Sequence, residues 1–134
     1  MCIKPGEHGS TFGGNPLACA VAKAALEVVI EEDLAENAYN LGEYFREELN
    51  KFIKDSPIVK LVRGKGLLNA IVINDTEESK TAWNICLEMK NNGLLAKPTH
   101  GNIIRFAPPL TITKNQLDDC IKIIIDTLKG YKLD

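Results

Sequence analysis

The chain has 134 residues, of which 45% are hydrophobic and 25% are charged, and its formal net charge is −2. This length suits one domain with a real hydrophobic core. So small a net charge argues against a nucleic-acid partner and against an anionic membrane surface, and we expect neither.

The chain opens with a glycine-rich loop at residues 9–16, followed by a helix start. Asn15 has the side chain of an N-cap, and Pro16 fits the first helical position, where no N–H is needed. Ser10 and Thr11 add hydroxyl donors in front of that helix end, which suits an anion such as a phosphate. The alternative is an ordinary capped turn, and the spacing matches neither a P-loop nor a dinucleotide fingerprint.

Two helices are predicted next. The first, over 16–31, is apolar nearly all round, so we expect other parts of the protein to pack against it on both sides. Lys23 and Glu27 make it too polar to span a bilayer. The second runs from residue 34 to about 52 at helical spacing. Gly42 is expected to be a tolerated weak point in it, and Arg46 is expected on its polar side.

Strands are predicted over 58–62 and 67–73, with residues 63–66 as a bend between them. The second of these strands is almost continuously apolar, which indicates cover on both faces. A third helix follows, in which we expect Trp83 in the core and Gly93 as the end.

Two short strands, over 94–97 and 103–107, flank a hairpin loop. A last helix begins with a capping box, Thr113 with Gln116, and ends at Gly130. Its expected buried residues are Leu117, Cys120, Ile121, Ile124, Ile125 and Leu128, and residues 131–134 should fray. The order of elements predicts an α+β fold, a small antiparallel or mixed sheet with helices on one face.

The cysteines do not form a metal-binding pattern, because no Cys-x-x-Cys pair occurs and neither histidine is at ligand spacing from them. We therefore expect no metal site. Three of the four lie in apolar helical patterns and are predicted to be small buried hydrophobes, which fits a reducing compartment. These three are Cys19, Cys86 and Cys120, and the fourth is Cys2.

Arg105 is the most informative charged residue, because it interrupts an apolar strand. A buried guanidinium needs a partner, and its planar fork suits a carboxylate. The alternative is an edge-strand arginine that points into water.

Four runs of residues form a recognisable set. They are Gly-Glu-His-Gly-Ser-Thr-Phe-Gly-Gly-Asn-Pro-Leu-Ala at 6–18, Arg-Gly-Lys-Gly-Leu-Leu at 63–68, Gly-Leu-Leu-Ala-Lys-Pro-Thr-His-Gly at 93–101 and Ile-Ile-Arg-Phe-Ala-Pro-Pro-Leu at 103–110. These runs resemble class III (ornithine-type) aminotransferases, which depend on pyridoxal phosphate, and the resemblance is strongest in the last two. It covers nearly all of this chain but only the C-terminal portion of the family's chains.

The resemblance implies a division of the chain and a reaction. Residues 1–15 would be a phosphate-contacting loop from the large domain, and 16–134 would be the interdomain helix and the small C-terminal domain of a fold type I enzyme. The full enzyme would move the δ-amino group of ornithine to 2-oxoglutarate, giving glutamate semialdehyde and glutamate. It would act as a homodimer or a higher homo-oligomer.

The resemblance also implies roles for particular residues. Ser10 and Thr11 would bind the phosphate of the pyridoxal phosphate held by the neighbouring subunit. Arg105 would bind a carboxylate of the dicarboxylate substrate, and a glutamate from the missing part would hold it when the diamino acid is bound. Lys97 and His100 match the family but are interpreted as loop and structural positions, and the turn at 63–66 is assigned no ligand.

The lysine that carries the cofactor lies upstream in the family, so we expect no catalytic residue in this chain and no activity from it alone. The expected compartment is the cytoplasm, with the mitochondrial matrix as the alternative. Rival functions are an acetylornithine or other ω-amino acid transaminase, a non-catalytic ligand-binding or regulatory α+β module, and a structural interaction domain.

Overall fold

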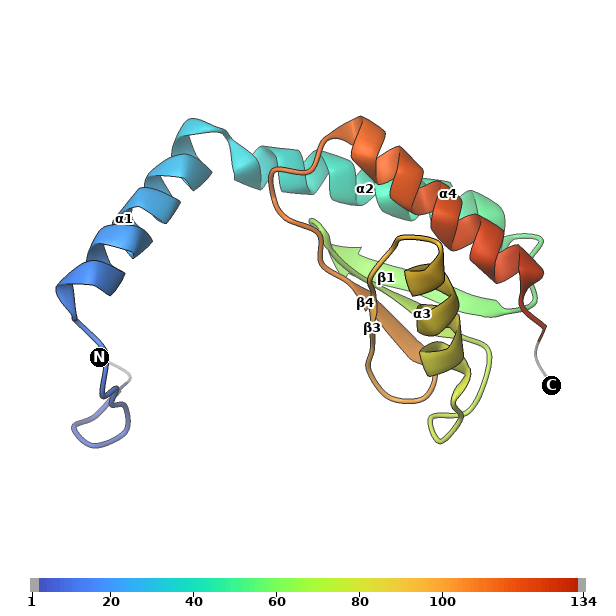
Figure 1. The fold of residues 1–134 in the computed structure, drawn as a ribbon, viewed down its shortest axis with the longest axis horizontal. Coiled ribbons are helices and arrows are strands. Elements are labelled where there is room, and N and C mark those ends of the chain that lie inside the picture. Colours follow the sequence, from blue (N-terminus) through green and yellow to red (C-terminus); the bar gives the residue numbers. More distant parts are fainter. Residues whose placement is uncertain (1–2, 133–134) are drawn as a thin grey trace. The chain divides into compact units, whose positions relative to one another are not determined.

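The computed structural model describes residues 3–132 and divides into two compact units, Met1–Leu34 and Ala35–Asp134, each of which is described by itself. Figure 1 shows the helices and strands of both units. In chain order they are α1 (Pro16–Glu31), α2 (Leu34–Ile53), β1 (Val59–Lys65), β2 (Leu68–Ile73), α3 (Thr81–Asn91), β3 (Lys97–Pro98), β4 (Ile103–Phe106) and α4 (Lys114–Gly130).

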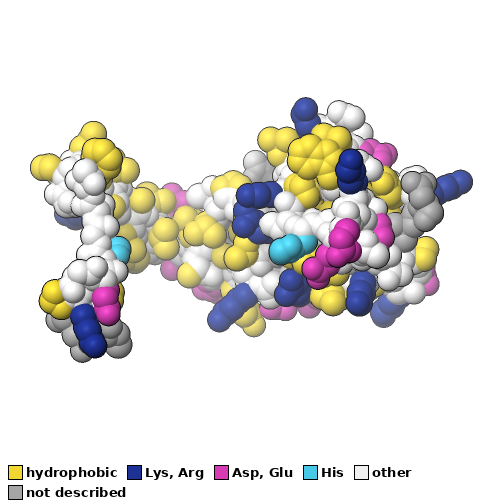
Figure 2. Space-filling view, turned by 90° about the horizontal axis from the view of Figure 1, so that it is seen from below, with side chains coloured by type: hydrophobic (Ala, Val, Ile, Leu, Met, Phe, Trp, Pro, Cys, Tyr) yellow, Lys and Arg dark blue, Asp and Glu magenta, His cyan; other side chains and the backbone are white. Residues whose placement is uncertain are grey.

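The N-terminal unit consists of a loop and the helix α1. The Asn15 side chain accepts a hydrogen bond from the Ala18 amide at 2.9 Å, and its backbone is extended, as a cap requires. The predicted helix over 16–31 is therefore confirmed at both ends. None of its described residues is buried, and Leu17 is 77% exposed. Figure 2 shows hydrophobic side chains, in yellow, at the surface of this unit.

The C-terminal unit is a four-stranded antiparallel sheet in the order β1-β2-β4-β3, with its helices packed on one face. The inward face of the sheet contributes Ile71, Ile73, Ile104 and Phe106 to the core. Apolar stripes of α2, α3 and α4 close over these residues. The predicted α+β fold, with helices on one face of a small sheet, is confirmed.

Two predictions about the first hairpin are wrong. β1 continues through Lys65, so residues 63–65 belong to the strand and the turn lies at Gly66, where φ is +54°. β2 is not covered on both faces, because its residues alternate between the core and the opposite face of the sheet. The reason is that all the helices of this unit cover one face, which leaves Leu68 58% exposed on the other.

The helix α3 buries a different stripe from the one expected around Trp83. Its buried residues follow helical spacing from Ala82 to Met89, and Trp83 lies one position beside that stripe. Trp83 is 56% exposed, so its prediction as a core residue is wrong.

The three described cysteines differ in burial. Cys86 is buried, and desolvation raises the pKa of its thiol to about 11. Cys120 is half-buried rather than buried. Cys19 is exposed, contrary to expectation, because nothing in the N-terminal unit packs on that side of α1. Cys2 lies outside the described residues.

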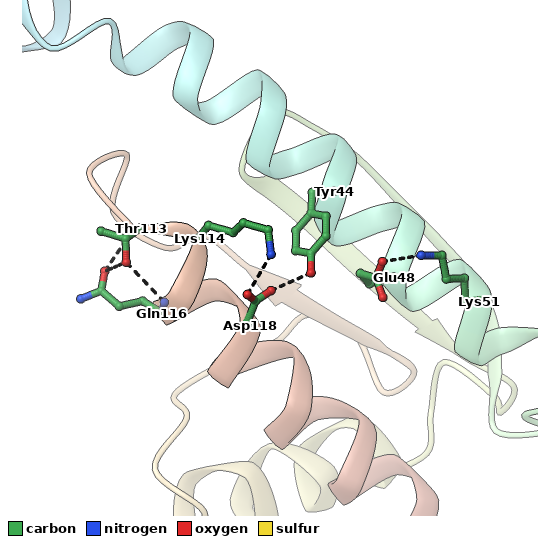
Figure 3. Close-up of polar contacts among 7 residues, drawn as sticks. All are labelled: Tyr44, Glu48, Lys51, Thr113, Lys114, Gln116 and Asp118. Atoms are coloured by element: carbon green, nitrogen blue, oxygen red, sulfur yellow. Dashed lines mark hydrogen bonds and ion pairs between the residues drawn. The ribbon is translucent and has the colours of Figure 1, made fainter.

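The helix α4 begins with the predicted capping box, in which Thr113 and Gln116 each accept from the other's backbone amide (Figure 3). It buries four of the six residues expected, together with Thr127, while Cys120 and Ile125 are half-buried. Tyr131 packs partly buried against the core rather than fraying, and residues 133–134 lie outside the described part.

Polar side chains join α2 to α4 at the surface. The Tyr44 hydroxyl donates to one Asp118 oxygen at 2.7 Å, and the Lys114 ammonium donates to the other at 2.9 Å (Figure 3). Lys114 also lies 4.2 Å from the centroid of the Tyr44 ring. The hydrogen bonds from Lys114 and then from Tyr44 hold the pKa of Asp118 below its usual value.

Tyr44→Phe is expected to raise the pKa of Asp118, because one of the two donors to its charged form disappears. A carboxyl with a depressed folded pKa stabilises the fold above its unfolded value, about 3.9, and that contribution is lost as the pH falls through the folded value. The variant therefore loses part of this contribution. Carboxyl-carbon NMR titration of Asp118 measures the change, with Tyr39→Phe as the exposed control. An unaltered titration would contradict the assignment.

A second group of polar contacts joins the first hairpin to α2. The Arg46 guanidinium donates to the Gly66 carbonyl at 3.0 Å and to the Asn69 side-chain oxygen at 2.6 Å, and it pairs with Glu43. Its side chain is only 12% exposed, because the hairpin covers this position on the polar side of α2. Beside it, Gly42 lies so near the hairpin that an added Cβ would overlap the Gly66 carbonyl oxygen.

Candidate functional site

The loop before α1 presents the hydroxyls of Ser10 and Thr11. Both residues are exposed, and neither side chain makes a hydrogen bond within residues 3–132. The loop closes in a turn in which the Asn15 amide and side chain both donate to the Phe12 carbonyl. A Cβ at Gly13 would meet Ser10 at 3.0 Å, so glycine permits the tight turn around that serine.

This loop has the features of an anion site. The helix end adds a partial positive charge, and the first turn of α1 contains no acidic residue. The hydroxyls are free to donate outward. These features are consistent with the predicted role of Ser10 and Thr11 as hydrogen-bond donors to a phosphate, which stays a prediction.

Arg105 lies in the C-terminal unit, so the structure does not bring it into one unit with Ser10 and Thr11. It stands on β4, which is an interior strand of the sheet, and its side chain is exposed on the face opposite the helices. The expectation of a buried guanidinium is therefore wrong for this chain. The alternative is right that Arg105 is exposed and wrong that its strand lies at the edge of the sheet. The helices occupy only the other face, which leaves Arg105 uncovered.

The register places Arg105 in a row across the sheet. Lys97 of β3 and Ala70 of β2 are its direct partners, and Arg63 of β1 is the partner of Ala70. Arg105 lines two shallow hollows on this face. One, of about 360 Å³, also includes Arg63 and Leu68, and the other, of about 290 Å³, also includes Lys97.

Sequence reasoning missed this grouping of Arg63 and Lys97 with Arg105. Directly opposed residues of an antiparallel pair point to the same face. The information needed was the pairing of Lys65 with Leu68 at the hairpin turn, which sets the register of β1 on β2. Assigning residue 63 to the strand rather than to a bend would have placed Arg63 in the same row as Arg105 and Lys97.

Other candidate features are structural. A hollow of about 300 Å³ at the edge of the core is lined mainly by apolar side chains such as Phe45, Phe106 and Leu117. His100 occupies the hairpin loop with φ of +61°. Within residues 3–132 no group of three or more His, Cys, Asp or Glu side chains could hold a metal ion. None of the helices described there has both the length and the apolar character needed to cross a bilayer.

Residues 1–128 match the family model of class-III aminotransferases, so the chain belongs to this family, whose members depend on pyridoxal phosphate.

Two of the similar proteins are named ornithine aminotransferase. The mitochondrial ornithine aminotransferase of Drosophila ananassae is 63% identical over 128 residues, which are 96% of this chain and 28% of that protein. The rat mitochondrial enzyme of the same name is 56% identical over 131 residues, 98% of this chain and 29% of that protein. The chain thus spans less than a third of the length of these relatives.

Two solved structures match the fold over nearly the whole chain. An acetylornithine aminotransferase from Elizabethkingia anophelis has a TM-score of 0.89 and 66% identity, covering 96% of this chain and 34% of that one. The ornithine delta-aminotransferase of Plasmodium falciparum has a TM-score of 0.84 and 51% identity, covering 95% of this chain and 33% of that one.

Proposed function

We propose that this chain is the C-terminal segment of an ornithine aminotransferase. The complete enzyme would transfer the δ-amino group of ornithine to 2-oxoglutarate, giving glutamate semialdehyde and glutamate. The observation that carries the proposal is the 63% identity, over 96% of this chain, to a protein of that name. The family match over residues 1–128 supports this enzyme over a non-catalytic regulatory module or an interaction domain.

The chain contributes binding groups to this reaction. Pyridoxal phosphate supplies the electron sink that lets an amino group be exchanged. Ser10 and Thr11 would donate hydrogen bonds to its phosphate, held in the neighbouring subunit. Arg105 would bind a carboxylate of 2-oxoglutarate through both arms of its guanidinium, which positions the acceptor. The lysine that carries the cofactor would come from the rest of the enzyme, so this chain alone would not transaminate.

A homodimer or higher homo-oligomer fits the character of α1. Its exposed apolar residues form the kind of surface that marks an interface. The division into a loop from the large domain, residues 1–15, and an interdomain helix with the small domain, 16–134, stays a prediction. Two Drosophila relatives and the rat relative have mitochondrial names, which fits the mitochondrial alternative, and the cytoplasmic expectation stays a prediction.

A donor comparison tests the proposed function. The complete enzyme is assayed with 2-oxoglutarate as acceptor and either ornithine or acetylornithine as donor. We expect a pyrroline-forming product from ornithine, with a higher kcat/KM than for acetylornithine. The 66% identity to a structure named acetylornithine aminotransferase supports the second candidate. Preference for acetylornithine would favour that candidate, and no product from either donor would reject both.

Thr11→Val in the complete enzyme is expected to weaken pyridoxal phosphate binding about tenfold. The change removes one hydroxyl donor to a charged phosphate while keeping the shape of the side chain. Cofactor retained after dialysis, followed by its absorbance, measures the loss. Thr111→Val, at another exposed threonine, is the matched control and should retain the cofactor. Equal retention by both variants would remove Thr11 from the cofactor site.

A further inference from the structure

The open face of the sheet places three cationic side chains in one transverse row. Lys97 and Arg105 are directly opposed on β3 and β4, and Arg63 follows on the far side of Ala70. All three are exposed. Lys and Arg side chains, in dark blue, are interspersed with hydrophobic ones on the surface of this unit in Figure 2.

This row has no acidic counterpart in the part of the chain that the structure describes. The four ion pairs there lie elsewhere, within α1, within α2 and within α4. Neither hollow beside Arg105 is lined by an aspartate or a glutamate. Like charges directly opposed on neighbouring strands destabilise a sheet, so Lys97 opposite Arg105 has an unfavourable cross-strand pairing that a bound anion would relieve.

We propose that Lys97 is a second carboxylate-binding residue, which acts beside Arg105 and selects the dicarboxylate acceptor. The proposal rests on the proposed function. Lys97 and Arg105 line the same hollow, so a carboxylate bound there would lie beside both cations. Arg105 supplies the planar fork, and Lys97 supplies a compact charge that needs no fixed orientation. Arg63 adds to the same positive field from the other hollow.

The row also discriminates between the two substrates of the proposed reaction. A dicarboxylate has negative charge at both ends and no positive charge, whereas ornithine has one carboxylate, two ammonium groups and a net positive charge. A cluster of cations attracts the dicarboxylate more strongly than the net-positive ornithine, so the same residues favour the acceptor. Removal of Lys97 should therefore weaken binding of the acceptor without weakening binding of the donor.

The test uses the complete enzyme with Lys97→Met, which keeps the length of the side chain and removes its charge. We expect the KM for 2-oxoglutarate to rise about tenfold, with the KM for ornithine unchanged or lower. Lys97→Arg, which keeps the charge, should restore most of the acceptor affinity. Lys122→Met, at an exposed position of α4, is the control of equal charge change and should alter neither KM.

A purely structural role for Lys97 would alter both KM values together and lower the melting temperature, and this outcome would overturn the proposal. An unchanged KM for 2-oxoglutarate would overturn it too. Glutarate is an unreactive dicarboxylate, so its binding can be measured by calorimetry without turnover. This measurement tests the anion site at Lys97 separately from the proposed function. Weaker glutarate binding by Lys97→Met in a protein that does not use ornithine would uphold the anion site and reject the proposed function.

Discussion

Gly42→Ala is expected to destabilise the C-terminal unit by about 3 kcal/mol, the upper end of the usual cost of overpacking. In an ordinary helix interior the same change is favourable by about 1 kcal/mol, because alanine is the better helix former. Here the added methyl would overlap the Gly66 carbonyl oxygen at the hairpin turn. Backbone cannot rotate aside as a side chain can, so α2 must move away from the hairpin.

Displacement of α2 has a second consequence at the same place. The Arg46 guanidinium would lose its hydrogen bonds to the Gly66 carbonyl and to the buried Asn69 side chain. Buried polar groups left without partners are costly, which adds to the steric effect. Urea unfolding followed by circular dichroism gives the change in free energy.

Gly130→Ala is the matched control for Gly42→Ala. Gly130 closes α4, its φ is not positive, and an added Cβ there would meet nothing within 4 Å. We expect this variant to be neutral or slightly more stable, by up to about 1 kcal/mol. If Gly42→Ala also left the unfolding midpoint unchanged or raised it, the close contact of α2 with the hairpin would be refuted.

Arg105→Met in the complete enzyme is expected to lower kcat/KM for 2-oxoglutarate by about thirtyfold or more. Truncating one partner of a hydrogen-bonded charge pair costs about 2–5 kcal/mol, and each 1.4 kcal/mol is a factor of ten. Arg105→Lys should recover only part of the loss, because an ammonium cannot form the two parallel bonds of a guanidinium. Steady-state kinetics with varied acceptor measures both.

The fold of the Arg105 variants serves as their control. Arg105 is exposed and makes no ion pair within residues 3–132, so the melting temperature of the C-terminal unit should stay within a few degrees of the parent. A variant that keeps its acceptor kinetics would exclude Arg105 from carboxylate binding. If a variant lost activity only because it unfolded, Arg105 would be a residue that stabilises the sheet and not one that binds the substrate.

Local signals in the sequence predicted the helix ends well. Asn15 with Pro16 marks the start of α1, and Thr113 with Gln116 marks the start of α4, because caps satisfy free amides through neighbours within one turn. The order of strands and helices along the chain predicted the fold class, because that order limits the layers into which the elements can pack. The family motifs identified Ser10, Thr11 and Arg105 as candidates without any knowledge of their surroundings.

The sequence by itself thus determined the elements, the class of fold and the two candidate anion-binding groups. Only the tertiary structure decided which face of the sheet the helices cover. Trp83 is exposed although it was expected in the core, the hairpin covers Arg46, and Arg105 is exposed, because burial depends on where separate elements pack. The row that joins Arg105 to Lys97 and Arg63 depends on strand register, which is set by hydrogen bonds between segments far apart in the chain.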